Sequence, residues 1–246
     1  MTLDEAEPVE QAGLRCKFST LDHVITCCRS IEVGGEYQEP LVLTSIDYKN
    51  AFDSVEPAKV RKALEEQGVE AQYTKVLSEC HSGCTTVIRL FLNDIEVSVE
   101  RGVRQGDPVL LNIFSACLES VIRNSDWSTF GVLIDAERLN HLRFAEDIVL
   151  ITRSPEDASE MLRRLHGEGG ESGLTINTTK IKVMRSAFSS QQPVLLQGVP
   201  VEDVSEYVYL GRLHNMENDR LQNFTGNCRK TTSSLGKNHL DHLDSR

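Results

Sequence analysis

The sequence lacks the features that would direct a chain into a membrane or along the secretory route. Only 39% of its 246 residues are hydrophobic and 6% are aromatic, and no apolar run approaches the ~18 residues that a membrane span needs. Residues 1–10 are acidic and polar, so we see no signal peptide and expect an intracellular protein, in the cytoplasm or the nucleus. No segment is repetitive or of low complexity, which favours one or two globular domains.

Paired cysteines and an excess of basic residues are absent too. The seven cysteines are odd in number and irregularly spaced, and no second Cys or His pair accompanies Cys80 and Cys84 at zinc-ligand spacing. We therefore expect free thiols. Lys and Arg number 26 against 37 Asp and Glu, which gives a net charge of −11. Because nucleic-acid-binding proteins usually carry basic patches, this charge counts against a nucleic-acid partner.

The pattern of apolar residues predicts an α+β fold. The expected strands cover residues 41–46, 85–92, 95–99, 139–143, 148–152, 181–184 and 207–213. The expected helices cover residues 20–31, 56–67, 70–81, 108–124 and 155–166. This order favours an antiparallel sheet with helices on one face. Residues 41–46 are almost wholly apolar, as expected of a strand that is covered on both faces.

The apolar spacing assigns an inner face to each expected helix, including the helices at residues 20–31 and 70–81. In residues 20–31 the apolar spacing places four side chains inside, which are Val24, Ile25, Cys28 and Ile31. Gly34 and Gly35 should end this helix. In residues 70–81 the same reasoning buries Tyr73, Val76, Leu77 and Cys80.

Acidic residues stand at the ends of the expected strands. Asp47 directly follows residues 41–46, and Glu146 and Asp147 lie in the turn between two strands of a hairpin. Carboxylates of this kind are ligands for divalent metal ions, so the arrangement suggests a two-metal centre for phosphoryl transfer. An Asp at a strand end is otherwise a turn or cap residue, and for Asp47 alone that reading would be preferred.

Five motifs in order resemble the reverse transcriptases of non-LTR (LINE-type) retrotransposons, those of RTE-type elements most. They are residues 47–55 (DYKNAFDSV, motif A), 101–108 (RGVRQGDP, motif B), 144–147 (FAED, motif C), 173–177 (GLTIN) with Lys180 (motif D), and 209–211 (YLG, motif E). Residues 11–15 (QAGLR) are similar to a fingers segment of the same enzymes. Any one motif is weakly specific, whereas five in order are strongly so.

The resemblance covers roughly residues 10–215 and implies the palm of a right-hand polymerase. Residues 41–187 would form the palm, with its antiparallel sheet. Residues 1–40 would be an acidic lead and a partial fingers segment. Residues 188–246 would hold the motif E strand, the start of an incomplete thumb and a tail that we cannot assign.

The activity that the resemblance implies is RNA-directed DNA polymerisation. A nucleotide from a dNTP would be added to the 3′-hydroxyl of a DNA primer on an RNA template, with two Mg²⁺ ions that Mn²⁺ can replace. Asp47, Glu146 and Asp147 take the places of the family's metal ligands and the adjacent carboxylate. Lys180 resembles the motif D lysine proposed to protonate pyrophosphate, although a solvated surface lysine is the plain alternative.

Other positions are assigned by resemblance to substrate contacts. Phe52 takes the place of the aromatic residue that excludes a ribose 2′-hydroxyl. The alternative is a core role, and both roles can hold together. Gln105 and Gly106 would lie against the template and the incoming nucleotide. The remaining contacts to nucleotide, primer or template would come from Arg101, Arg104, Tyr209, Leu210 and Gly211. Arg143 is a further candidate phosphate contact.

Three departures from the family pattern lead us to expect an impaired enzyme. Motif C usually has two aspartates, and Glu146 adds a methylene where Mg²⁺ demands near-ideal geometry. A misplacement of about 1 Å can cost ~10²-fold in rate. After Pro108 the family usually has Leu-Ser-Pro, where this chain has VLL. The chain is also short for the family, without the N-terminal fingers motif, the endonuclease domain or a complete thumb, where basic charge would be expected.

These departures leave two alternatives to an active polymerase. One is a catalytically dead retroelement remnant that acts, if at all, as a binding or interaction module. The other is an acidic interaction domain whose motifs are fortuitous.

Overall fold

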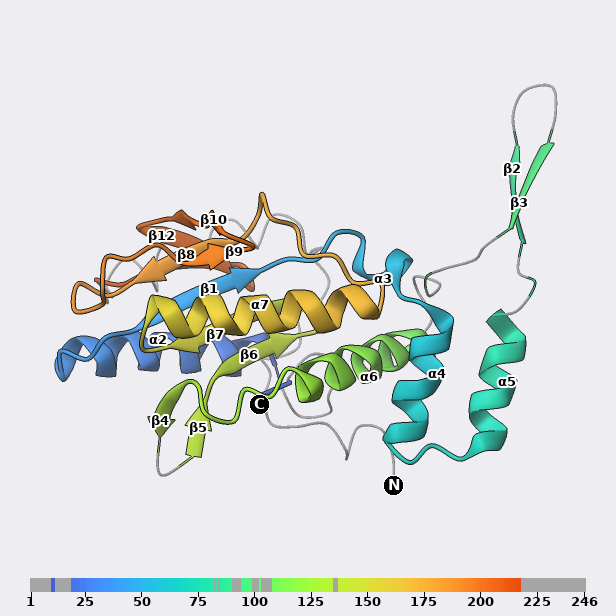
Figure 1. The fold of residues 1–246 in the computed structure, drawn as a ribbon, viewed down its shortest axis with the longest axis horizontal. Helices are drawn as coiled ribbons and strands as arrows, with labels where there is room; N and C mark the ends of the chain where they lie inside the picture. Colours follow the sequence, from blue (N-terminus) through green and yellow to red (C-terminus); the bar gives the residue numbers. More distant parts are fainter. Residues whose placement is uncertain are drawn as a thin grey trace, which may run out of the picture.

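A five-stranded sheet lies at the centre of the fold, with the strand order β11-β8-β1-β7-β6 (Figure 1). The structure is a computed structural model, and it describes residues 10–11, 19–81, 83, 85–89, 94–98, 102, 108–134 and 137–217. The strands are β1 (Val42–Ile46), β6 (His141–Phe144), β7 (Asp147–Thr152), β8 (Lys182–Arg185) and β11 (Glu202–Asp203). All neighbours are antiparallel except β11, which runs parallel to β8. Val42, Leu43 and Ile46 are at most 1% exposed, so β1 is covered on both faces, as expected.

One face of the sheet is covered by helices. These are α4 (Pro57–Glu66), α6 (Pro108–Asn124) and α7 (Pro155–Glu171), and Figure 1 shows α7 lying across β1 and β7. The start of α7 follows from its sequence: Pro155 is the first helical residue, and Ser154 Oγ accepts a hydrogen bond from the Asp157 backbone N–H. The predicted antiparallel sheet with a helical layer is confirmed.

The opposite face carries a second hydrophobic layer, which the pattern of apolar residues did not predict. It consists of α2 (Thr20–Glu36) and the hairpin of β12 (Glu206–Tyr209) and β13 (Arg212–Asn215). From α2, Cys27 and Ile31 belong to the same buried cluster as Leu43, Val149 and Met184 of the sheet. This layer covers the second face of β1 and β7.

Two helices continue past the glycines at which we expected them to end. The helix α2 runs through Gly34 and Gly35 to Glu36, and α7 runs through three glycines to Glu171. A glycine costs about 1 kcal/mol in a helix, and packing can outweigh that cost. Gly34 is itself buried, and Gly169 is close to Leu174.

The assigned inner faces of two helices were partly wrong. In α2, Val24 and Ile31 are buried as expected, but Ile25 is 53% exposed and Cys28 is only partly buried. His23 and Cys27 are buried instead. In α5 (Ala71–His81), Leu77 is partly buried against the core, but Tyr73 and Val76 are exposed and Thr74 is buried instead. The predicted burial of Cys80 lies outside what the structure describes. The helix α5 packs mainly on α4, so its apolar stripe is not covered by the sheet.

The remaining elements are short. They are α3 (Ala51–Ser54) and the hairpins β2 (Thr85–Arg89) with β3 (Asp94–Ser98), β4 (Val132–Ile134) with β5 (Glu137–Leu139), and β9 (Leu195–Leu196) with β10 (Val199–Pro200). Figure 1 shows β2 and β3 projecting away from the sheet. The single strand predicted at 207–213 was wrong: Leu210 and Gly211 have φ values of 48° and 77° and form the turn between β12 and β13. None of the described helices is long and apolar enough to cross a membrane.

Candidate active site

Asp47 and Asp147 stand opposite one another at the same end of two neighbouring strands. The register pairs Ile46 of β1 with Ile148 of β7. Continuing it by one residue sets Asp47 beside Asp147, because their strands are antiparallel. Directly opposite residues have Cβ atoms about 4.5–5.5 Å apart. The sheet therefore brings together two carboxylates that lie a hundred residues apart in the chain.

Glu146 is held beside this pair by a tight turn. Phe144 pairs with Asp147 across β6 and β7, which leaves Ala145 and Glu146 as a two-residue turn. Ala145 has a φ of 53°, in the left-handed region that a side chain disfavours. The predicted hairpin with an acidic turn is thus present, and its tip is conformationally constrained.

The motif D loop is fastened to Asp47. Lys180 Nζ lies 3.1 Å from Asp47 Oδ2, and the Asn177 side chain donates a hydrogen bond to the same oxygen at 3.3 Å. The Asn177 backbone N–H donates to the Asp47 carbonyl at 2.8 Å, and Tyr48 forms a β-bridge with Ile176. These contacts place a lysine and an amide at the end of β1, where the carboxylates meet.

The electrostatics of the site favour a cation. Burial raises the pKa of Asp147, and the negative charges of Glu146 and Asp47 raise it further, against an opposing effect of Lys180. A carboxyl whose pKa is raised by like charges gains most from a positive partner. The donors are all oxygen atoms, which suits Mg²⁺ or Mn²⁺.

The arrangement differs from a closed metal cage. Within the described ranges, no three side chains of His, Cys, Asp and Glu are gathered in a way that would hold a metal ion by themselves. A magnesium ion usually binds one or two carboxylates and completes its shell with water and substrate phosphate. The carboxylates of Asp47, Glu146 and Asp147 fit this open type of site by their chemistry.

The sequence matches a family model described as "Reverse transcriptase (RNA-dependent DNA polymerase)" over residues 5–213. The chain belongs to the reverse transcriptase family. Its relatives are retroelement proteins, as the non-LTR resemblance predicts. A transposon-derived protein of Caenorhabditis elegans is 43% identical over 91 residues, which are 35% of this chain and 32% of that protein. The Pol polyprotein of the type-1 retrotransposable element R2 from Nasonia vitripennis is 29% identical over 153 residues, which are 62% of this chain and 15% of that protein.

Solved telomerase structures share the fold. Telomerase from Candida albicans, solved with a fragment of telomeric RNA, superposes with a TM-score of 0.55 at 14% identity, over 87% of this chain and 35% of that chain. Apo telomerase from Candida tropicalis, truncated from its C-terminal domain, gives 0.54 at 13% identity, over 84% of this chain and 39% of that chain. The palm prediction is confirmed. This chain spans about a third or less of the length of the curated relatives named above.

Phe52 is part of the core. It lies on α3, within motif A, is half-buried, and its ring centroid is 4.5 Å from that of Phe114 on α6. The core role that the sequence left open is therefore real. The proposed contact with a nucleotide sugar requires only the remaining exposed edge, and it stays a prediction.

Arg143 cannot serve as the phosphate contact that we expected. Its side chain is fully buried, and Nη2 donates to Glu119 Oε2 at 2.5 Å. Arg143 is buried because it lies within β6, whose neighbouring residues are buried on both faces of the sheet. The sequence signal was present, since His141 and Arg143 lie within an otherwise apolar strand, but charge alone suggested solvent.

Tyr209 is also buried, at 3% exposure. Its hydroxyl lies 3.4 Å from His23 Nδ1, between the β12–β13 hairpin and α2. A contact of this side chain with a primer is therefore inconsistent with the fold. The turn residues Leu210 and Gly211 are the part of motif E that remains a candidate for such a contact.

Motif B is described at only part of its length. The expected contact residues Arg101, Arg104, Gln105 and Gly106 lie outside the described residues. Gly102 packs on motif A: its N–H donates to the Val55 carbonyl at 2.9 Å, and an added Cβ would come within 2.8 Å of the Asp53 backbone. The absence of a side chain at this position therefore allows motifs A and B to meet.

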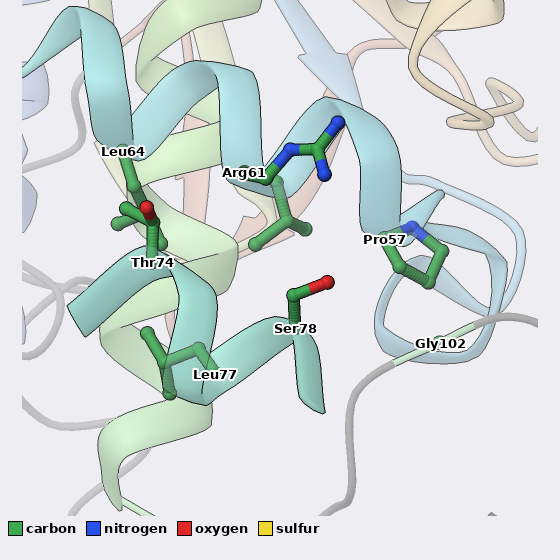
Figure 2. Close-up of a pocket in the computed structure, with 8 residues that line it drawn as sticks. Pro57, Arg61, Leu64, Thr74, Leu77, Ser78 and Gly102 are labelled. Carbon is green, nitrogen blue, oxygen red and sulfur yellow. The ribbon is translucent and has the colours of Figure 1, made fainter. Parts of the chain in front are cut away.

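A small cavity between α4 and α5 lies next to this junction (Figure 2). Its volume is about 20 Å³, roughly the space that one water molecule needs. Leu64 and Leu77 line it, and Gly102 lies at its edge. It is too small for a nucleotide and carries no carboxylate, so we regard it as a packing defect and not as a substrate site.

Proposed function

We propose that this chain is the palm of an RNA-directed DNA polymerase, which adds a nucleotide to a primer 3′-hydroxyl. The observation that carries the proposal is the β1–β7 register, which sets Asp47 opposite Asp147 in a chain of the reverse transcriptase family. The partners would be an RNA template, a DNA primer and a dNTP.

The metal site would use Asp47, Glu146 and Asp147 as ligands for two Mg²⁺ ions, with Mn²⁺ as a substitute. When bound, such ions lower the pKa of the primer hydroxyl and neutralise the negative charge of the leaving pyrophosphate. The rigid end of β1 orients Asp47, and the two-residue turn orients Glu146 and Asp147. This division of the ligands between two paired strands would set the spacing between the carboxylates, on which the rate depends.

The remaining residues would bind and protonate the substrate. Lys180 is paired with Asp47, and its side chain is 64% exposed, so it can turn toward a pyrophosphate and donate a proton from Nζ. Phe52 would support the nucleotide sugar from α3. The motif B residues 104–106 would approach the base, as the family resemblance implies.

The test is incorporation of a labelled dNTP by the purified chain on a primed RNA template, with Mg²⁺ or Mn²⁺. We expect slow, metal-dependent extension that Asp47→Asn abolishes. Asp53→Asn is the matched control, because Asp53 is an exposed acid of the same motif and should leave extension unchanged. Template binding without incorporation above the Asp47→Asn background would contradict the proposal and favour a remnant that only binds nucleic acid.

A further inference from the structure

A buried polar cluster lies beneath the acidic turn, and the proposed reaction does not use it. Its members come from β6, from α6 and from the short described segment at residues 10–11. Gln11 and Arg143 are 0% exposed, Ser115 is 1% exposed and Glu119 is 4% exposed. Polar groups buried to this degree usually form hydrogen bonds with one another.

Gln11 joins the turn to α6. The Ala145 backbone N–H donates to Gln11 Oε1 at 3.3 Å, and Gln11 Nε2 donates to Ser115 Oγ at 3.0 Å. One amide side chain therefore connects the tip of the β6–β7 hairpin with the helix beneath it. Gln can do this without a charge, because its amide supplies an acceptor and a donor at once.

The backbone beside Gln11 is fixed to the same hairpin. The Arg143 N–H donates to the Glu10 carbonyl at 2.8 Å, and Gln11 forms a parallel β-bridge with Arg143. The Arg143 side chain in turn pairs with Glu119 on α6, and Glu119 also accepts a hydrogen bond from Arg123. Residues 10–11, β6 and α6 thus form one connected unit, and Gln11 extends it to the turn.

Ala145, whose backbone N–H donates to Gln11, has a strained backbone conformation. Ala145 has a φ of 53°, a conformation that costs energy for any residue with a side chain and persists where surrounding contacts impose it. We propose that Gln11 is a positioning residue, which locks Ala145 in this conformation and thereby fixes the directions of the Glu146 and Asp147 carboxylates. The effect of Gln11 on metal binding rests on the proposed function.

Hydrogen exchange of the full chain, without metal, tests the lock directly. Gln11→Leu keeps the size of the side chain and removes both hydrogen bonds. We expect amide exchange in residues 141–148 to accelerate about fivefold to tenfold, the factor that the loss of a buried hydrogen bond represents. Gln11→Glu should restore much of the protection, because a carboxylate accepts from the Ala145 N–H and from the Ser115 hydroxyl.

Ser125→Ala is the matched control. It also removes a buried hydroxyl, which is 1% exposed and donates to the Val121 carbonyl within its own helix end. It should lower overall stability without selective exchange at the turn. Equal exchange of residues 141–148 in Gln11→Leu and in Ser125→Ala would overturn the proposal.

Titration with Mn²⁺, followed by the electron paramagnetic resonance of the free ion, tests the consequence for the carboxylates. We expect Gln11→Leu to weaken Mn²⁺ binding about fivefold to tenfold, and Ser125→Ala to leave it unchanged. Faster exchange with unchanged Mn²⁺ affinity would overturn the positioning role and leave Gln11 structural. If the unsubstituted chain takes up no Mn²⁺, the proposed function fails, and the exchange comparison still decides whether Gln11 locks the turn.

Discussion

Glu146 is the residue at which this chain departs from its family within the proposed metal site. The turn that carries it has two residues and a strained tip, so the backbone cannot easily withdraw to compensate for a longer side chain. The extra methylene must therefore be accommodated by rotation of the Glu146 side chain itself. This is a cost in geometry and not in charge, because the carboxylate is retained.

We expect Glu146→Asp to raise the rate of nucleotide incorporation by up to ~10²-fold, the cost that a misplacement of about 1 Å can have. The effect should fall mainly on kcat, because the ligand acts in the transition state. Steady-state extension of a primed RNA template measures it. Glu202→Asp, an exposed exchange of the same kind on β11, is the control and should change nothing. An unchanged kcat in Glu146→Asp would remove Glu146 from the set of metal ligands.

Lys180 Nζ lies 3.1 Å from Asp47 Oδ2, so its positive charge would compete with a metal ion for this carboxylate. We expect Lys180→Gln to tighten Mn²⁺ binding by a few fold, since an exposed ion pair of this kind contributes only ~0.2–1 kcal/mol. The same substitution should slow incorporation. Titration with Mn²⁺ measures the first effect, with Lys182→Gln as the control, because Lys182 pairs with Glu202 instead. Weaker Mn²⁺ binding in Lys180→Gln would show that the lysine supports the metal and does not compete with it.

At the scale of elements, the motifs meet through backbone contacts that leave no room for side chains. Gly102 of motif B and Gly173 of motif D both pack against α3 and its flanks, at Asp53 and Ser54. The Glu56 N–H also donates to the Ser172 carbonyl at 3.3 Å. Motif A therefore contacts motif B on one side and the start of motif D on the other.

Gly173→Ala should destabilise the fold through two effects, the backbone strain of a positive φ and a steric clash with Ser54. Gly173 has a φ of +83°, and an added Cβ would lie 2.4 Å from the Ser54 carbonyl oxygen. We expect a loss of about 3 kcal/mol or more in the free energy of unfolding, in the upper part of the usual range for single substitutions. Chemical denaturation measures it. Gly198→Ala has a similar φ of +79° and no atom within 4 Å, so it isolates the strain and should cost about 1 kcal/mol. Equal losses would show that the close approach to Ser54 relaxes freely.

The sequence was informative where local chemistry decides an element. The helix predicted from residue 155 begins there, at Pro155, and the apolar run before Asp47 predicted a strand that is buried on both faces. It was uninformative where distant packing decides. No local sequence pattern indicates that α2 covers the second face of the sheet, or that Arg143 forms an ion pair with Glu119 in the interior. The proposed site was found through its motifs, whereas the contact of Gln11 with Ala145 links residues 134 positions apart and has no local signal.

At the scale of the whole molecule, three buried histidines make the fold sensitive to acid. Burial lowers the pKa of His23 and of His214 to about 4, and burial together with the Arg143 and His23 charges lowers the pKa of His141 to about 3. All three are neutral in the folded chain at neutral pH. They lie around the sheet and its second layer, on α2, β6 and β13.

We expect stability to fall steeply as the pH drops below about 6.5, the ordinary pKa of an unfolded histidine. Below that pH the unfolded chain binds protons that the folded chain refuses, so stability is present above pH 6.5 and is lost progressively down to the folded-state values. Each pKa unit corresponds to about 1.4 kcal/mol, so we expect acid unfolding before pH 4. Urea denaturation between pH 8 and pH 4 measures it. His141→Gln should flatten the profile, and an unaltered slope would show that His141 is hydrated in the folded state.

Both edges of the central sheet are closed to further strands. Residues 10–11 run along the outer side of β6, where Gln11 bridges Arg143. At the other edge β11 has only two residues, both acidic, and their carboxylates pair with Lys182 and Arg185 of β8. Short, charged or covered edges prevent the backbone of one molecule from pairing with that of another. We therefore expect residues 10–11, which we propose to lock the acidic turn, to have a second effect, which is to hinder aggregation by strand addition at β6. Removing these residues should cost solubility as well as order at the turn.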